Sequence, residues 1–241
     1  MENTITAGLS RQLALARALE VTANNIANQT TAGFKGERLE FREWLAAVAG
    51  ETGDAEVSLV YDSDSYSDFS AGGLEQTHAP LDFAIDGDGF FAVEAEAGPR
   101  YTRDGRFTLS AYGELVTRGG ARVLDSGGSA IVLDPEAGAP ALSPDGMLEQ
   151  AGAPVAGLGV FQFADNAVLV RRGDNLYEAV AAPDAKVAPR IRQGFIETSN
   201  VVAVAAMTDM IEIMRAYEQA ARVVETSDEL ARETVRTLSE G

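Results

Sequence analysis

The residue types that usually perform catalytic chemistry are scarce in this chain, and their spacing fits no common active site. Its one histidine, His78, lies in a predicted loop, and there is no cysteine, so a zinc site of the His or Cys type cannot be assembled. No serine lies in a G-x-S-x-G turn, the nucleophile motif of many hydrolases. Carboxylates are abundant, so a carboxylate-based hydrolase remains one hypothesis, which would require two carboxylates of unlike pKa in one pocket.

Three short patterns resemble ligand-binding motifs but lack essential positions. The turn Asp86-Gly87-Asp88-Gly89 starts like a calcium loop, yet Phe90 occupies a place that needs an oxygen ligand. The run Asp62-Ser63-Asp64 fails in the same way, and Gly157-Leu158-Gly159 lacks the third glycine and following helix of a dinucleotide site. The sequence therefore predicts no metal, no cofactor and no small-molecule substrate, and it predicts that the chain is not an enzyme.

Charge and hydropathy exclude further classes of partner. The net charge is −18, and residues 51–100 hold twelve acidic residues against one basic residue, Arg100. Without a basic face a nucleic-acid partner is not expected. No apolar run approaches the ~20 residues of a membrane span. The first residues lack the basic, apolar and small-residue segments of a secretory signal, so we expect no cleaved signal peptide.

Both ends of the chain read as long amphipathic helices. Residues 3–28 place Ile5, Leu9, Leu13 and Ala16 on one face, before an Asn- and Gly-rich stop. Residues 201–238 carry a row in steps of three and four, which we call the predicted seam: Met207, Met210, Met214, Tyr217, Ala221, Val224, Asp228, Ala231, Val235 and Leu238. Such a row must be buried against another helix, so the two terminal helices are expected to pair as a coiled coil.

Between these helices the sequence reads as β-structure. Asp-Gly and Gly-Gly turns separate short runs rich in β-branched and aromatic residues from residue 81 to residue 196. The predicted class is α+β, with an antiparallel β-sandwich or open barrel in the middle. Residues 35–50 read as a short amphipathic piece. The predicted domains are a helical domain of residues 1–44 with 198–241, an extended connector of residues 45–75, and a β-rich middle domain of residues 76–197.

Four separated runs of residues resemble the signatures of bacterial flagellar rod and hook proteins. One spans residues 23–35 with Asn24-Asn25-Ile26-Ala27-Asn28 and Gly33-Phe34-Lys35, and two lie in the middle at residues 81–91 and 101–107. The last spans residues 194–201 and 210–218. The length and the opening residues resemble a proximal-rod member of this family, and a distal-rod member is the alternative.

The resemblance implies a self-assembling structural subunit of the flagellar basal body. It implies export through the flagellar type III apparatus, a place in the periplasmic rod, and contacts with other rod proteins and with copies of itself. Subunit contacts are then expected along both terminal helices. The expected contact residues are Ile5, Leu9, Leu13, Ala16, Asn24, Asn25, Ile26, Asn28, Gly33 and Phe34, then Asn200, Val201, Met207, Met210, Met214, Tyr217, Ala221, Val224, Asp228, Val235 and Leu238.

Two alternatives stay open at this stage. The asparagines at the end of the first helix either satisfy backbone and inter-subunit hydrogen bonds or simply stop the helix. In a different functional class, the β-rich domain could be a non-catalytic module that binds a peptide or acts as a chaperone. Uniform amide protection of the terminal helices in the isolated protein would favour that module.

Overall fold

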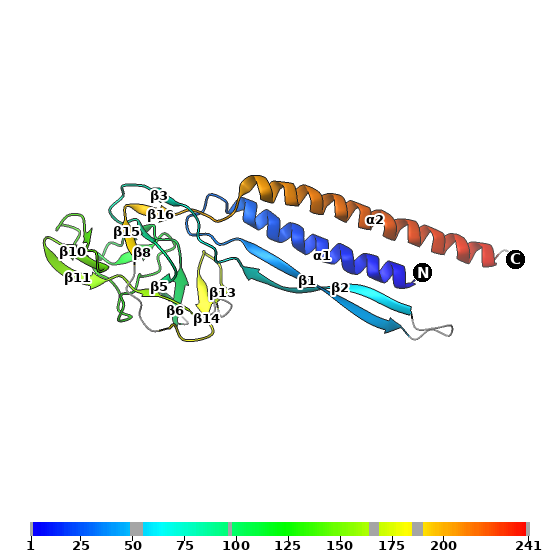
Figure 1. Cartoon of the computed structure of the whole chain (residues 1–241), viewed down its shortest axis with the longest axis horizontal. Coiled ribbons are helices and arrows are strands. Elements are labelled where there is room, and N and C mark those ends of the chain that lie inside the picture. Colours follow the sequence, from blue (N-terminus) through cyan, green and yellow to red (C-terminus); the bar gives the residue numbers. More distant parts are fainter. Residues whose placement is uncertain (1, 49–54, 96–97, 164–168, 185–189, 240–241) are drawn as a thin grey trace. The chain divides into compact units, whose positions relative to one another are not determined.

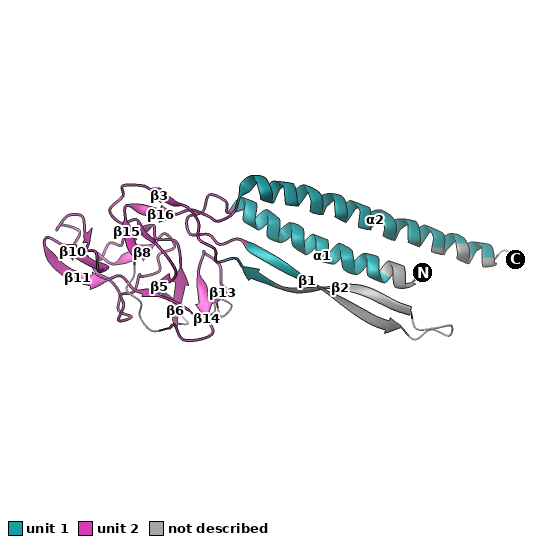
Figure 2. Cartoon of the chain, viewed as in Figure 1, with its two compact units in different colours: residues 1–27, 37–68, 202–241 teal, residues 28–36, 69–201 magenta. Residues whose placement is uncertain are grey.

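The computed structural model describes residues 2–48, 55–95, 98–163, 169–184 and 190–239. Within these ranges the side chains of residues 2–5, 41–48, 55–64, 231, 234–235 and 238–239 are not described. The chain divides into two compact units, each built from separate stretches of sequence (Figure 2). Unit 1 comprises residues 1–27, 37–68 and 202–241, and unit 2 comprises residues 28–36 and 69–201.

Unit 1 consists of two helices and a β-hairpin. Helix α1 spans Glu2–Ala27 and helix α2 spans Ala203–Ser239. Strands β1 (Glu37–Val48) and β2 (Ala55–Ser67) pair antiparallel. Helix α1 lies alongside α2 and also contacts both strands (Figure 1). Where the sequence suggested an amphipathic piece and then an extended connector, the chain forms this hairpin.

The hairpin was hard to foresee because its apolar residues are spaced ambiguously. Leu39, Phe41, Trp44 and Leu45 follow in steps of two, three and one, which fits neither a strand period of two nor a helix period of 3.6. The pairing also shifts register between Leu39 and Phe41, and such a bulge interrupts the alternation on which a strand prediction depends.

Unit 2 contains the remaining strands, all short. They are β3 (Leu74–Gln76), β4 (Phe83–Ile85), β5 (Phe90–Ala95), β6 (Gly98–Thr102), β7 (Phe107–Leu109), β8 (Leu115–Thr117), β9 (Ala141–Leu142), β10 (Met147–Gln150), β11 (Ala153–Gly157), β12 (Val160–Phe161), β13 (Leu169–Arg171), β14 (Tyr177–Ala179), β15 (Ile191–Gln193) and β16 (Phe195–Glu197). All of the strand pairs are antiparallel, and the largest sheet has the order β12-β5-β6-β14-β13. The α+β class is confirmed, and no sheet among the described strands closes into a barrel.

Most of the predicted strand positions match, and the differences have a local cause. The apolar run of residues 155–163 predicts a single strand, but the chain forms β11 and β12 with a break at Gly159. The backbone there passes so close to Leu124 and Asp125 that a Cβ would lie 2.8 and 2.7 Å from their carbonyl oxygens. Residues 122–124 and 130–133 also read as strands in the sequence, but they make only isolated bridges, such as Leu124 with Ala130. In this region a Gly-rich turn leaves only a few residues between the bridged positions, so the pairing does not extend into a longer strand.

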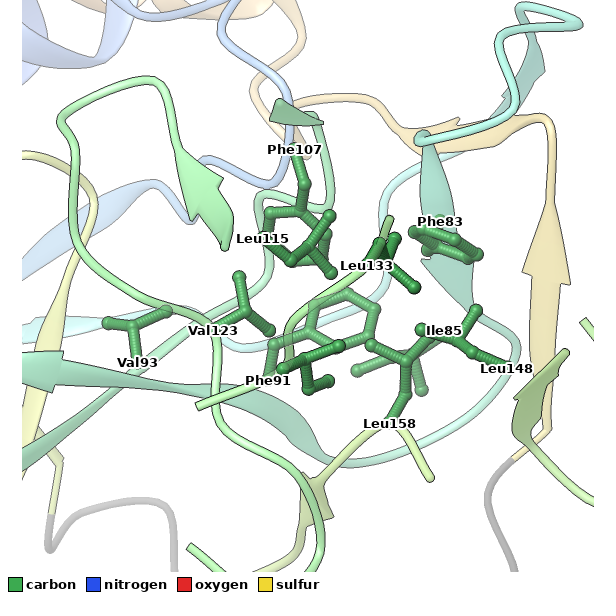
Figure 3. Close-up of a cluster of buried hydrophobic side chains, with 11 residues drawn as sticks. Phe83, Ile85, Phe91, Val93, Phe107, Leu115, Val123, Leu133, Leu148 and Leu158 are labelled. Atoms are coloured by element: carbon green, nitrogen blue, oxygen red, sulfur yellow. The ribbon is translucent and has the colours of Figure 1, made fainter. Parts of the chain in front are cut away.

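The core of unit 2 is a cluster of aliphatic and aromatic side chains from β4, β5, β7, β8 and β10 (Figure 3). Phe83, Phe91 and Leu115 are completely buried there. A second cluster surrounds Tyr177, also completely buried, whose ring lies against Phe69 and Phe90. These two clusters stabilise unit 2, because burial of their apolar side chains removes apolar surface from water.

Candidate functional site

In unit 1 the helices meet through small side chains. The buried residues of α1 are Ala14, Ala18 and Val21, and α2 buries Ala220. A Cβ added to Gly8 would lie 2.6 Å from Cγ2 of Val224, so the two helices approach closely at that point. Most of the half-buried residues of α2 form one row, which we call the inner stripe: Ala203, Ala206, Met210, Ile213, Ala216, Val224 and Ser227, with the buried Ala220 among them.

A second apolar row on α2 is exposed. This outer stripe consists of Val204, Met207, Ile211, Met214 and Tyr217, which are between 38% and 76% exposed. On α1, Leu9 and Leu13 are 51% and 65% exposed. Large exposed apolar side chains in rows are unusual on a soluble surface and mark a place where another molecule packs. The outer stripe and these two leucines therefore form a candidate interaction surface.

The predicted seam is divided between the two stripes. Met210 and Val224 belong to the inner stripe, whereas Met207, Met214 and Tyr217 belong to the outer one. Ala221 and Asp228 are half-buried, and Asp228 makes an ion pair of 2.8 Å with Arg232. The side chains of three predicted contact residues lie outside the described residues: Ile5, Val235 and Leu238. No helix in the described part of the chain is long and apolar enough to cross a membrane.

The asparagines at the end of α1 have different surroundings. The Asn25 amide pairs with the Glu37 backbone, donating to its carbonyl oxygen and accepting from its N–H, both at 2.8 Å. This double contact ties the end of α1 to the start of β1. Asn28 accepts hydrogen bonds from the hydroxyl and the backbone N–H of Thr31 in a turn. Asn24 is exposed and Ile26 and Ala16 are half-buried.

In unit 2 the sequence motifs from both ends of the chain come together. We call residues 28–36 the α1 root and residues 195–201 the α2 root, because they adjoin the two helices in sequence. Gly33 N–H donates to the Glu197 carbonyl oxygen at 2.7 Å, and Gly36 N–H donates to Asn200 Oδ1 at 2.7 Å. Asn200 N–H donates to the Phe34 carbonyl oxygen at 3.3 Å.

Gly33 and Phe34, which we expected at a subunit contact, are buried by contacts within unit 2. Phe34 is 2% exposed and lies under the guanidinium of Arg171, 4.5 Å from its ring centre. Gly33 has a φ of +65°, and a Cβ there would lie 2.3 Å from the Arg103 carbonyl carbon. Asn200 and Val201 are half-buried.

Three buried charges lie at the centre of this junction, and sequence reasoning gave none of them a role. Lys35 Nζ lies 2.6 Å from Glu197 Oε1, and Arg103 Nη1 lies 3.2 Å from Glu197 Oε2. Their residues are at most 5% exposed. Two features of the sequence could have indicated these buried charges. Lys35 is one of two lysines in the chain, and the acidic Glu197 directly follows the apolar pair Phe195-Ile196.

The neighbouring loop is held by a further charged pair. Arg106 donates from Nε and Nη2 to the two carboxylate oxygens of Asp104, at 3.0 and 2.8 Å. That hydrogen bonding raises the pKa of Arg106 above its ordinary value, so the guanidinium remains charged. In the part of the chain that the structure describes, no three His, Asp or Glu side chains group as a metal site would require. The contacts of the junction therefore hold several segments of unit 2 together.

Comparison with protein families gives three matches along the chain. Residues 5–35 match the model of the flagella basal body rod protein, and residues 84–150 match that of the flagellar hook protein FlgE/F/G D1 domain. Residues 192–237 match the C-terminal model of the flagellar basal body rod FlgEFG proteins. The first match includes residues 28–35 of the α1 root, and the last match includes the whole α2 root.

Curated relatives extend over almost the whole chain. The flagellar basal-body rod protein FlgF of Caulobacter vibrioides is 42% identical over 241 residues, which cover 99% of this chain and 98% of the relative. FlgF of Rhizobium meliloti is 38% identical with the same coverage. The rod protein FlgG of Bacillus subtilis is 31% identical over 260 residues, covering 98% of each chain.

Proposed function

The chain belongs to the family of flagellar basal-body rod proteins and is a structural subunit of the rod, and we propose that it assembles there through its two terminal helices. The observation that carries this proposal is the outer stripe: a row of large apolar side chains left exposed beside a helix interface built from small ones. A neighbouring subunit would bury this row. A Met or Leu side chain gains about 1.5–3 kcal/mol on full burial, so several in one row can hold subunits together.

The proposed contact is helical and head-to-tail between copies and other rod proteins. Within one chain, the inner stripe of α2 pairs with α1 as one layer of a coiled coil, and the outer stripe with Leu9 and Leu13 packs on the next subunit. Met207 and Met214 suit such a surface because methionine adapts to neighbours of slightly different shape. The contact residues predicted from the sequence remain proposals here, with the exposed ones preferred.

We place the subunit in the proximal rod, since the FlgF relatives match at 42% and 38% identity and the FlgG relative at 31%. The distal rod is the alternative. The proposed site of action is the periplasmic rod, reached through the flagellar type III apparatus without a cleaved signal peptide. We propose a non-enzymatic role, in which residues 1–44 with 198–241 build the shaft and the β-rich domain of residues 76–197 extends from it. The sequence predicted this first part as helical, and it contains α1, α2 and part of strand β1.

The outer stripe can be tested by a paired polar substitution. Changing both Met207 and Met214 to Gln keeps the side-chain length but makes burial of the stripe unfavourable, at about 1–3 kcal/mol per side chain. We expect the variant to fold with an unchanged urea midpoint, because both residues are 47–48% exposed, and to be strongly reduced in isolated basal bodies.

The matched control for this test is Met147→Gln in unit 2. Met147 is also exposed, at 36%, but lies on β10, away from both helices in the sequence. Quantitative immunoblots of basal-body fractions should show normal amounts of the control. Normal incorporation of the Met207 and Met214 double variant would rule out the outer stripe as a subunit contact.

A further inference from the structure

The junction in unit 2 contains more buried positive charge than negative charge on its three central side chains. Lys35 and Arg103 both pair with Glu197, and the three residues are 0%, 5% and 2% exposed. Burying an ion is costly unless a partner of opposite charge and further hydrogen bonds compensate it. The Glu197 carboxylate therefore forms ion pairs with two buried cations at once.

The hydrogen bonds around these charges come from five separate segments. Glu197 Oε1 also accepts from the Gly72 backbone N–H at 2.9 Å, and Lys35 Nζ also donates to the Ser70 carbonyl oxygen at 2.6 Å. Arg103 Nη1 donates to the Gly87 carbonyl oxygen at 2.9 Å. The segments that share this polar centre are the α1 root, residues 70–72, the turn at Gly87, the loop at residue 103 and the α2 root.

The backbones of these segments are in direct contact as well. A Cβ added to Gly72 would lie 1.9 Å from the Thr198 carbonyl oxygen, and Thr198 N–H donates to the Gly73 carbonyl oxygen at 2.7 Å. With the Gly33 contact to Glu197 described above, the α2 root lies between the α1 root and residues 70–73. Neither root can take its observed position with its full set of hydrogen bonds while the other is absent.

From these contacts we propose that Glu197 is a latch that makes docking of the two roots on the β-strands of unit 2 a single event. If the α1 root docked alone, Lys35 would be buried beside Arg103 without the Glu197 carboxylate. If the α2 root docked alone, Glu197 would be buried without the Lys35 ammonium. Both half-docked states place a charge in a poorly compensated site, so both are scarcely populated relative to the open and the closed states.

The latch has a consequence for the order of folding. Lys35 and Glu197 are separated by 162 positions, and contacts of such separation form late because a long loop must close. Strand β16, the last strand of unit 2 in the sequence, contains Glu197, whose carboxylate pairs with both Lys35 and Arg103. Unit 2 thus remains open at this junction until residues near 197 have joined it, whatever the chain later assembles with.

The latch can be tested by native-state amide hydrogen exchange on the full chain. Glu197→Gln keeps the shape and removes the charge. We expect exchange in residues 33–36, 70–73 and 195–200 to rise together by about 100-fold or more, while strands β5 and β8 stay protected. The matched control is Glu178→Gln, whose partner Arg172 lies 2.6 Å away at a surface where both side chains are about half exposed; it should change nothing.

A second substitution separates charge from packing. Adding Lys35→Met to Glu197→Gln removes one of the two cations, so part of the lost protection should return in all three segments. Lys35 Nζ and Glu197 Oε1 are 2.6 Å apart, so the two losses are not expected to add in any case, and the deciding result is where protection returns. Recovery confined to one of the three segments would overturn the latch, as would a rise in exchange in Glu197→Gln confined to residues 195–200.

If Glu197→Gln leaves unit 2 unfolded, the unmodified chain still decides the question. Exchange measured in increasing, sub-denaturing urea reports which segments open together. The latch predicts one shared opening constant and one urea slope for residues 33–36, 70–73 and 195–200. Distinct slopes, with the α2 root opening first while the α1 root stays protected, would overturn it.

Discussion

A chain that ends at residue 206 is expected to fold unit 2 and yet to be absent from the rod. The cut removes the inner stripe from Met210 onward and the outer stripe from Met207 onward, while unit 2 ends at residue 201 and remains complete. Helix α1 loses the α2 surface that it contacts. Because most helical stability in proteins comes from tertiary packing of an amphipathic face, α1 is expected to lose helix content as well.

The truncated chain can be compared with the full chain in two measurements. Amide exchange in strands β5 and β8 should be equal in the two proteins, and far-ultraviolet circular dichroism should show a loss of helix greater than the deleted residues account for. Immunoblots of purified basal bodies should then detect only the full chain. Incorporation of the truncated chain would show that α2 is dispensable for assembly.

Gly105→Ala is expected to have the largest effect of a single substitution on unit 2. A Cβ on Gly105 would lie 1.7 Å from the Phe83 carbonyl oxygen and 3.1 Å from the ring of Phe91, both in the core. The Gly105 carbonyl oxygen also accepts from Phe83 N–H at 3.0 Å, so the two backbones cannot separate without losing that hydrogen bond. We expect a loss of about 3 kcal/mol or more in the free energy of unfolding, since overpacking in a buried site moves backbone as well as side chains.

The matched control is Gly157→Ala in β11. A Cβ at Gly157 would meet nothing closer than 3.7 Å and its φ is not positive, so its free energy of unfolding should change by less than about 1 kcal/mol. Urea unfolding followed by near-ultraviolet circular dichroism of unit 2 measures both variants. Equal midpoints for Gly105→Ala and Gly157→Ala would mean that the close approach to Phe83 does not constrain the fold.

The sequence predicted the elements that local rules decide. Helices α1 and α2 follow from unbroken periodic rows, and strands β4, β5 and β7 follow from Asp-Gly turns between short apolar runs. The β-hairpin of residues 37–67 was missed because its apolar spacing suits no single period. Local patterns thus located most of the elements, but they did not give the pairing of β1 with β2.

The sequence did not distinguish the two stripes of α2. Ala206, Met210 and Ile213 lie one position away from Met207, Ile211 and Met214, so both rows satisfy the same steps of three and four. The inner stripe contains several alanines of α2 and Val224, which lies close to Gly8, whereas Met207, Ile211 and Met214 are about half exposed. Only the folded chain shows which row is already covered.

The buried charges could not be predicted, although all three lie in motifs that the sequence made visible. A pairing between residues 35 and 197 is decided by tertiary contacts, and charged residues are buried only when such a partner exists. Lys35, Arg103 and Glu197 each looked like an ordinary surface residue in its own segment. Their meeting explains why runs far apart in the sequence act as one structural feature.

The central claim is that the outer stripe is exposed in the free subunit and buried in the rod. Because the chain has no cysteine, Met214→Cys gives a single labelling site, and Tyr112→Cys, at a residue 85% exposed in unit 2, gives the control. Maleimide labelling should proceed readily at both sites in the purified subunit. In isolated basal bodies the account predicts labelling of Met214→Cys slowed by about tenfold or more relative to Tyr112→Cys; equal labelling at residue 214 in the free subunit and in the rod would contradict it.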